Sequence, residues 1–134
     1  MAILMSGGML HASFSQRKLE SSIASATKSG KLIAFVFYQD YALPNCPSCV
    51  SSTNANNKAI KSAIPRSNVV LIEIDPGEKN LDKLPACVDA KGGTPRLVIT
   101  DAKGEKVITS ANGAPDRDKA KEIKTIVEKA RSGK

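Results

Sequence analysis

Short apolar runs alternate along the chain with segments of helical periodicity. The runs at 31–38, 68–75 and 96–100 consist mostly of aliphatic and aromatic residues. Runs of this length with little polar alternation are typical of strands that are buried on both faces of a sheet. We expect the run at 31–38 to be a central strand.

Helices are predicted around these strands. The segment 13–29 has apolar residues near helical spacing, a capping-box pattern formed by Ser13 and Gln16, and Gly30 directly after it, so a first helix is expected there. A second helix is expected from Pro47 to about residue 64, because proline suits the first turn of a helix. The other predicted helices are a short one at 80–90, interrupted near Pro85, and a last one at 115–130.

The segment 101–104, Asp-Ala-Lys-Gly, has the composition of a tight turn, and a further strand-type run follows at 105–110. These two features predict an antiparallel hairpin with the run at 96–100. The full order is helix, strand, helix, strand, helix, strand, strand, helix. This order predicts an α/β fold in which a mixed sheet of about four strands is covered by helices on both faces.

The chain has 134 residues, of which 41% are hydrophobic and 25% charged, which fits one soluble globular domain. We place that domain at 13–134. No apolar run approaches the roughly 20 residues of a membrane span. Residues 1–12 are apolar, small and uncharged, and two interpretations of them stay open: an unstructured tail, or the remnant of an export signal.

The formal net charge is +7, which raises nucleic-acid binding as a hypothesis. The basic residues are spread along the chain among acidic ones, and two tyrosines, three phenylalanines and no tryptophan are available to stack on bases. A nucleic-acid partner is therefore not expected.

Cys46, Pro47, Ser48 and Cys49 form a CxxC motif at the predicted start of the second helix. Structural zinc would need further ligands, and only Cys87 and His11 remain, far apart in sequence. Covalent haem attachment needs a histidine after the second cysteine, and a valine stands there. The context favours a redox pair and no metal, and Cys87 is interpreted as a half-buried small residue.

The chain resembles the thioredoxin-like superfamily in its order of elements and in two motifs, the CxxC after the first central strand and Gly93-Thr94-Pro95 before the hairpin. The resemblance covers about 13–130. It implies a three-layer α/β/α sandwich, a cis peptide bond before Pro95, and packing of that proline against the CxxC. Looser members of the superfamily from bacterial envelopes are the nearest type.

The resemblance also implies an activity, thiol–disulfide exchange with protein substrates. Cys46 would be the exposed nucleophile and Cys49 the resolving cysteine beneath it, with Pro47 and Ser48 as the active-site dipeptide. A helix start lowers the pKa of a cysteine and favours its thiolate. The residues expected to contact substrate are Thr94, Pro95, Tyr41 and Pro44.

The sequence departs from typical thioredoxins in two ways. No tryptophan precedes Cys46, where the segment 41–45 stands instead, so substrate contacts are expected to differ. The central strand carries Val36 or its neighbours where thioredoxins keep a buried carboxylate that assists proton transfer. A different proton route from Cys49 is therefore expected.

A second hypothesis stays open, a non-catalytic binding or structural module whose cysteines form a static disulfide or bind a metal such as copper. For the enzyme we expect protein disulfides or dithiols as substrates, an unidentified redox partner, no cofactor beyond the Cys46–Cys49 disulfide, and a monomer. The apolar leader slightly favours the bacterial periplasm or envelope over the cytoplasm.

Overall fold

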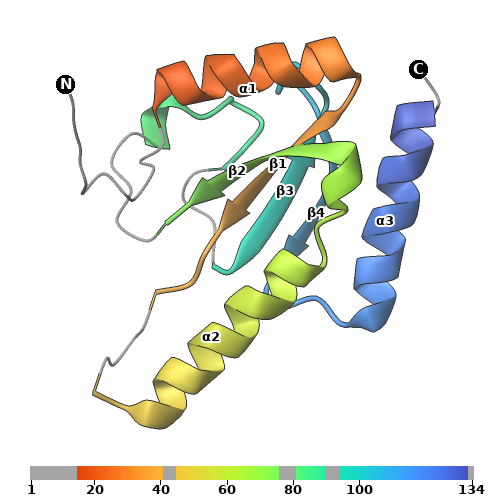
Figure 1. The fold of residues 1–134 in the computed structure, drawn as a ribbon. Coiled ribbons are helices and arrows are strands. Elements are labelled where there is room, and N and C mark those ends of the chain that lie inside the picture. The colour runs from red at the N-terminus through yellow and green to blue at the C-terminus, as the bar shows by residue number, and fades with distance from the viewer. Residues whose placement is uncertain (1–14, 41–44, 76–80, 90–93, 133–134) are drawn as a thin grey trace.

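A computed structural model describes residues 15–40, 45–75, 81–89 and 94–132 (Figure 1). The described elements, in chain order, are α1 (Gln16–Ser29), β1 (Leu32–Phe37), α2 (Pro47–Ser62), the short 3-10 helix η3 (Arg66–Asn68), β2 (Val69–Ile74), the 3-10 helix η4 (Leu81–Lys83), β3 (Arg96–Thr100), β4 (Val107–Asn112) and α3 (Arg117–Ser132). None of the helices in these ranges combines the length and the apolar character that a bilayer crossing requires.

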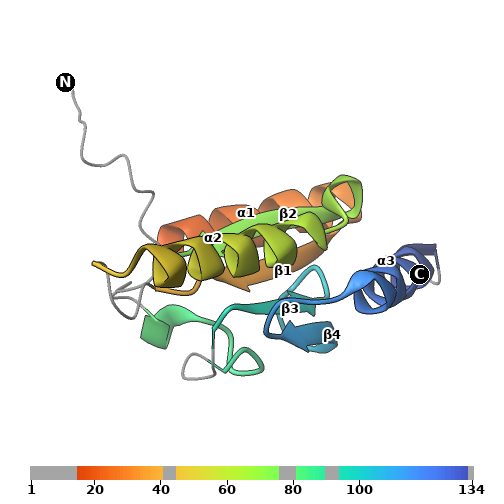
Figure 2. The same cartoon turned by 90° about the horizontal axis from the view of Figure 1, so that it is seen from below.

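The strands form one four-stranded sheet in the order β2-β1-β3-β4. β1 pairs in parallel with β2 and antiparallel with β3, and β3 pairs antiparallel with β4. Phe35 in the middle of β1 lies opposite Ile72 on one side and Val98 on the other. Every residue of β1 is buried, as expected of a central strand, and Figure 2 shows the succession from β1 through β3 to β4. The predicted mixed sheet is confirmed.

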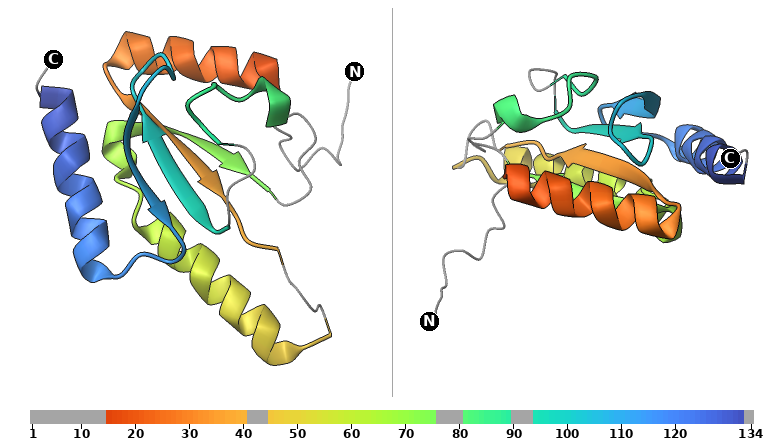
Figure 3. Two further views of the ribbon diagram at one scale, coloured as in Figure 1. Left: turned by 180° about the vertical axis from the view of Figure 1, so that it is seen from behind. Right: turned by 90° about the horizontal axis from the view of Figure 1, so that it is seen from above.

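Helices cover both faces of this sheet. α1 packs on β1 and β2, and Figure 3 shows that it does not extend over β3 and β4. The core on this face contains Leu19, Ala26, Ile33, Phe35, Phe37, Ile72, Ile74, Leu84, Val88 and Val98. The core on the opposite face, beneath α2 and α3, includes Ala34, Val36, Ile60, Ala63, Leu97, Ile99, Ile123 and Val127. The predicted three-layer α/β/α sandwich is confirmed.

The first helix begins later than its sequence pattern predicts. Ser15 has an extended backbone, and its hydroxyl accepts a hydrogen bond from the Lys18 N–H, so Ser15 is the N-cap of α1. Such a hydroxyl satisfies one of the amide groups that a helix start leaves unpaired. Ser13 lies outside the described residues. The predicted end is right, because Gly30 adopts a left-handed backbone with φ 72° and donates its N–H to the Ala26 carbonyl.

Two other predicted elements differ from the structure. In place of a helix at 80–90, the described residues form η4 and then turns, in which Leu84 bonds back to Leu81 and Val88 to Pro85. Proline has no N–H to continue a helix, which explains the stop. The last strand starts at Val107 rather than Glu105, because the Asp101 carboxylate accepts the Glu105 N–H and holds that residue in the turn.

Candidate active site

Cys46 and Cys49 form a disulfide at the start of α2, with their Cα atoms 5.2 Å apart. Both cysteines are half-buried, so the expected contrast between an exposed Cys46 and a covered Cys49 is not seen in this state. Pro47 and Ser48 between them are exposed. The pair is therefore within reach of a partner molecule that approaches the end of the helix.

Cys46 is the N-cap of α2. Its backbone is extended, its carbonyl accepts the Val50 N–H at 3.0 Å, and its Sγ accepts the Cys49 N–H at 3.2 Å. The Ser48 hydroxyl lies 3.3 Å from the same sulfur. Pro47 fills the first turn, which contains no acidic residue. A negative charge on Cys46 Sγ would thus meet a backbone N–H, a hydroxyl and the positive end of the helix dipole.

A pocket of about 340 Å³ adjoins Cys49 and is lined by Gln39, Ser48, Ser52 and Thr53 as well. Thr53 is 4% exposed and stands one turn after Cys49 on the same helix face. Apart from Cys49 itself, the lining groups are hydroxyls and an amide. Val36 on β1 is fully buried in the core beneath α2 and α3. A proton that leaves Cys49 would pass to water or to these neutral groups.

Gln39, which follows β1, is tied to α2 by asparagines. The Asn57 amide accepts the Gln39 N–H at 2.7 Å and donates to the Gln39 carbonyl at 3.1 Å. Asn56 donates to the Gln39 side-chain oxygen at 3.0 Å. These residues are not among the predicted site residues, although the sequence holds a signal: Cys49, Thr53 and Asn57 recur every four positions, which places them on one face of a helix.

Two further predicted site residues, Thr94 and Pro95, directly precede β3. The Thr94–Pro95 peptide bond is cis, Pro95 is buried and Thr94 is exposed. Thr94 lines a different pocket from the one beside Cys49, and Figures 1 and 3 show the start of α2 beyond the start of β3. Among the described residues, Thr94 and Cys49 thus line two different pockets, and a joint site with the CxxC stays a prediction. Tyr41 and Pro44 lie outside the described residues.

Cys87 is half-buried, as expected, and its thiol donates to the Gly104 carbonyl at 3.3 Å. Burial raises the pKa of this thiol, and the charge of Asp101 adds to the effect. A thiol with a raised pKa is a poor nucleophile near neutral pH. Within the described ranges, His, Cys, Asp and Glu side chains form no group of three or more that could hold a metal ion.

Comparisons with known proteins find a likeness to solved structures. No protein-family model and no curated protein matches the chain. A solved structure described as a disulphide isomerase from Xylella fastidiosa Temecula1 aligns with 87% of this chain and 88% of its own, at 18% sequence identity and a TM-score of 0.44. The element order, the mixed sheet in the order β2-β1-β3-β4, and a CxxC disulfide at the helix that follows β1 give this chain the fold of the thioredoxin-like superfamily.

Proposed function

We propose that the chain is a thiol–disulfide oxidoreductase that exchanges disulfides with protein substrates through Cys46 and Cys49. The observation that carries the proposal is the position of the disulfide. The disulfide closes the first turn of α2. There Cys46 Sγ accepts a hydrogen bond from the Cys49 N–H, and the intervening Pro47 and Ser48 are exposed. The same groups that contact the sulfur in the disulfide would stabilise its thiolate after reduction.

In the reductive direction, the Cys46 thiolate attacks one sulfur of a substrate disulfide. A mixed disulfide forms, the substrate S–S bond breaks, and the first substrate sulfur leaves as a thiolate that takes a proton from water. Cys49 then loses its proton and attacks Cys46 Sγ, which releases the second substrate sulfur and restores the Cys46–Cys49 disulfide. Two electrons pass from the dithiol to the substrate, and the reverse sequence oxidises a substrate dithiol.

The half-buried sulfurs favour substrates that can present a disulfide on an exposed, extended segment. We expect Tyr41, Pro44, Thr94 and Pro95 to contribute to holding such a segment after the substrate binds. The enzyme would act as a monomer and would need an external redox partner to regenerate the working form of the pair. The exchange would need no bound cofactor beyond the cysteine disulfide.

A static disulfide is the second candidate function. The observation that favours it is that the pocket lined by Thr94 includes neither Cys46 nor Cys49. In that case the disulfide would only close the first turn of α2, and the chain would act as a binding or structural module. The reduced pair could then also bind a metal such as copper.

Reduction of insulin by dithiothreitol, with turbidity as the readout, separates the two functions. The parent protein should accelerate the reaction, and Cys46→Ser should abolish the acceleration. Cys49→Ser should accumulate a mixed disulfide with the substrate, because the resolving thiol is gone. Cys87→Ser removes a thiol of similar burial outside the pair and should retain the parent activity.

The reduction potential of the Cys46–Cys49 pair gives an independent test. A working reductant should have a potential near about −270 mV and an oxidant one near about −120 mV, whereas a structural disulfide falls below about −300 mV. The potential is measured by equilibration in thiol buffers and alkylation of the free thiols. A value below that limit together with no insulin activity would overturn the oxidoreductase proposal in favour of a static disulfide.

A further inference from the structure

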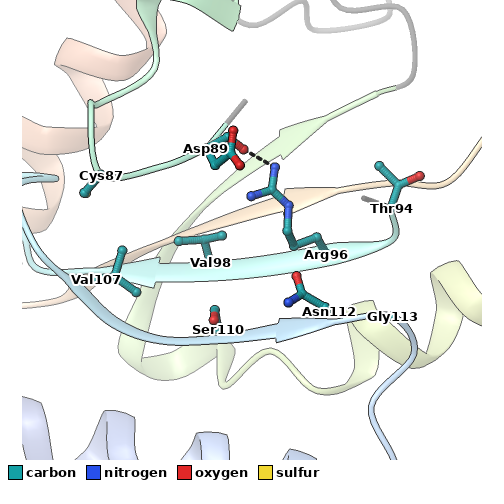
Figure 4. Close-up of a pocket in the computed structure, with 9 residues that line it drawn as sticks. All are labelled: Cys87, Asp89, Thr94, Arg96, Val98, Val107, Ser110, Asn112 and Gly113. Carbon is teal, nitrogen blue, oxygen red and sulfur yellow. Dashed lines mark hydrogen bonds between the residues drawn. The ribbon is translucent and has the colours of Figure 1, made fainter. Parts of the chain in front are cut away.

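A pocket of about 430 Å³ lies on the α1 side of the sheet, over β3 and β4. α1 covers only β1 and β2 of this face, so the hairpin strands are left open beside the segment 81–89. Figure 4 shows Arg96 and Asn112 side by side on neighbouring strands, with Asp89 and Cys87 across from the hairpin. The pocket contains neither cysteine of the CxxC pair.

Arg96 is the unusual residue of this pocket. It is 5% exposed, and the centre of its guanidinium lies 4.2 Å from the centroid of the Phe37 ring. Phe37 is the residue of β1 that pairs with Arg96. Its Nη2 donates to the backbone carbonyl of Asp89, as Figure 4 shows. Its Nε–H is buried and has no hydrogen-bond partner within the described part of the chain. A buried donor without an acceptor is unfavourable, and proteins rarely leave one.

Uncommitted polar side chains surround this guanidinium. Asn112 is the register partner of Arg96, and Ser110 is that of Val98, so all four side chains share one face of the hairpin. Thr94, Ser110 and Asn112 are exposed, and no hydrogen bond of their side chains is present among the residues that the structure describes. Their hydroxyl and amide groups can therefore donate to a molecule that enters the pocket.

The buried Nε–H of Arg96, which has no partner among the described residues, favours a ligand that brings a hydrogen-bond acceptor such as a carboxylate. Burial lowers the pKa of Arg96, while the nearby charge of Asp89 acts in the opposite direction. The buried guanidinium has thus lost part of the stabilisation that water would give its charge. A negative group on the ligand, in addition to Asp89, would restore part of that stabilisation. Val98 and Val107 line the rest of the pocket and suit the apolar body of a small molecule rather than a bare ion.

We propose that this pocket binds a carboxylate that carries a short aliphatic group, either a free organic acid or the C-terminus of a peptide. The carboxylate would sit at Arg96 and Asn112, and the aliphatic group would contact Val98 and Val107. Arginine presents several N–H donors to a carboxylate in a planar arrangement, which lysine cannot reproduce. The proposal does not depend on disulfide exchange, because the CxxC lies outside the pocket.

The probes for the test are N-acetylvaline and N-acetylvalinamide, which share the aliphatic side chain and end in a carboxylate and in a neutral carboxamide. Amide NMR spectra of the full chain should show saturable shifts with the acid, with a Kd on the order of 1 mM. The shifts should centre on residues 94–98 and 107–113, and the amide should cause at most weak ones. An acetylated tripeptide that ends in valine, in its acid and amide forms, distinguishes a peptide terminus from a free organic acid by which probe binds more tightly.

Arg96→Met should weaken binding of the acid by at least about tenfold, as expected for the loss of charged hydrogen bonds. Lys121→Met removes the same charge from the exposed surface of α3 and should leave Kd unchanged. If Arg96→Met does not fold, Asn112→Ala, which changes an exposed side chain, should weaken binding by about threefold. Equal binding of acid and amide, shifts centred away from the hairpin, or no saturable shift with any probe would overturn the proposal.

Discussion

Asn57 holds both backbone groups of Gln39, accepting its N–H at 2.7 Å and donating to its carbonyl at 3.1 Å. These two hydrogen bonds take the place of the strand-to-strand hydrogen bonds that the backbone loses where β1 leaves the sheet. A buried or half-buried peptide group needs such partners. Asn57 therefore fixes the exit of β1 against α2, two turns after the CxxC.

Asn57→Ala should lower the free energy of unfolding by about 1 to 3 kcal/mol, because it leaves two backbone groups without their partners. The measurement is urea unfolding followed by circular dichroism. Asn56→Ala is the matched control, since Asn56 bonds only the side-chain oxygen of Gln39 and its loss should cost less than about 1 kcal/mol. Equal losses of unfolding free energy in the two variants would show that the hydrogen bonds from Asn57 to the Gln39 backbone do not stabilise the fold more than the bond from Asn56.

The strands could be predicted from the sequence because their burial is local in origin. β1 is apolar at every position and β3 at its three central ones, and both strands are buried along their whole length. Pro47 likewise places the CxxC at a helix start. The link between Asn57 and Gln39 could not be predicted, because it joins residues 18 positions apart through the geometry of a loop. The burial of Arg96 could not be predicted from the sequence either, because it depends on the Phe37 ring of the neighbouring strand.

Tyr38 donates its hydroxyl proton to the Glu73 carboxylate at 2.6 Å. Burial, and then the bond to Glu73, raise the pKa of Tyr38 above its ordinary value of 10.0. The neutral phenol is thus favoured in the folded state. The resulting stability is fully present below about pH 10, where the unfolded tyrosine is also neutral, and it is lost as pH rises above that value toward the folded pKa.

Tyr38→Phe should therefore be less stable than the parent by about 1 kcal/mol at pH 8, and the difference should shrink above about pH 10. Urea unfolding at several pH values measures it. Absorbance titration of Tyr41→Phe, which leaves Tyr38 as the one tyrosine in the sequence, should give a midpoint above 10.0. A midpoint at the ordinary value would contradict both the burial of the Tyr38 phenol and its bond to Glu73.

The Ser48 hydroxyl lies 3.3 Å from Cys46 Sγ, and in the reduced protein it can donate to the thiolate. Ser48→Ala should therefore slow alkylation of reduced Cys46 near neutral pH by about two- to fivefold, which corresponds to one modest hydrogen bond. Ser52→Ala changes a hydroxyl one turn further along α2, which makes no contact with Cys46 among the described interactions, and should leave the rate unchanged. The rates are measured with iodoacetamide in Cys49→Ser, Cys87→Ser backgrounds, so that Cys46 is the one thiol present. An unchanged rate in Ser48→Ala would mean that the backbone N–H and the helix dipole alone hold the thiolate.

Arg131, near the end of α3, ties that helix to the C-cap of α1 and to η3. Its guanidinium donates to the Gly30 carbonyl at 2.9 Å and to the Asn68 side-chain oxygen at 2.9 Å. Arg131→Ala should lower the free energy of unfolding by about 1 to 3 kcal/mol, and Arg131→Lys should recover only part of it, because an ammonium cannot span two separated acceptors in one plane. Both acceptors are neutral oxygens, so the loss should be nearly the same at low and high salt, unlike that of an ion pair.

Arg117→Ala, an exposed change in the first turn of α3, should stay within about 0.5 kcal/mol of the parent. A loss for Arg131→Ala that disappears in high salt would show that it acts through surface charge rather than through these bonds.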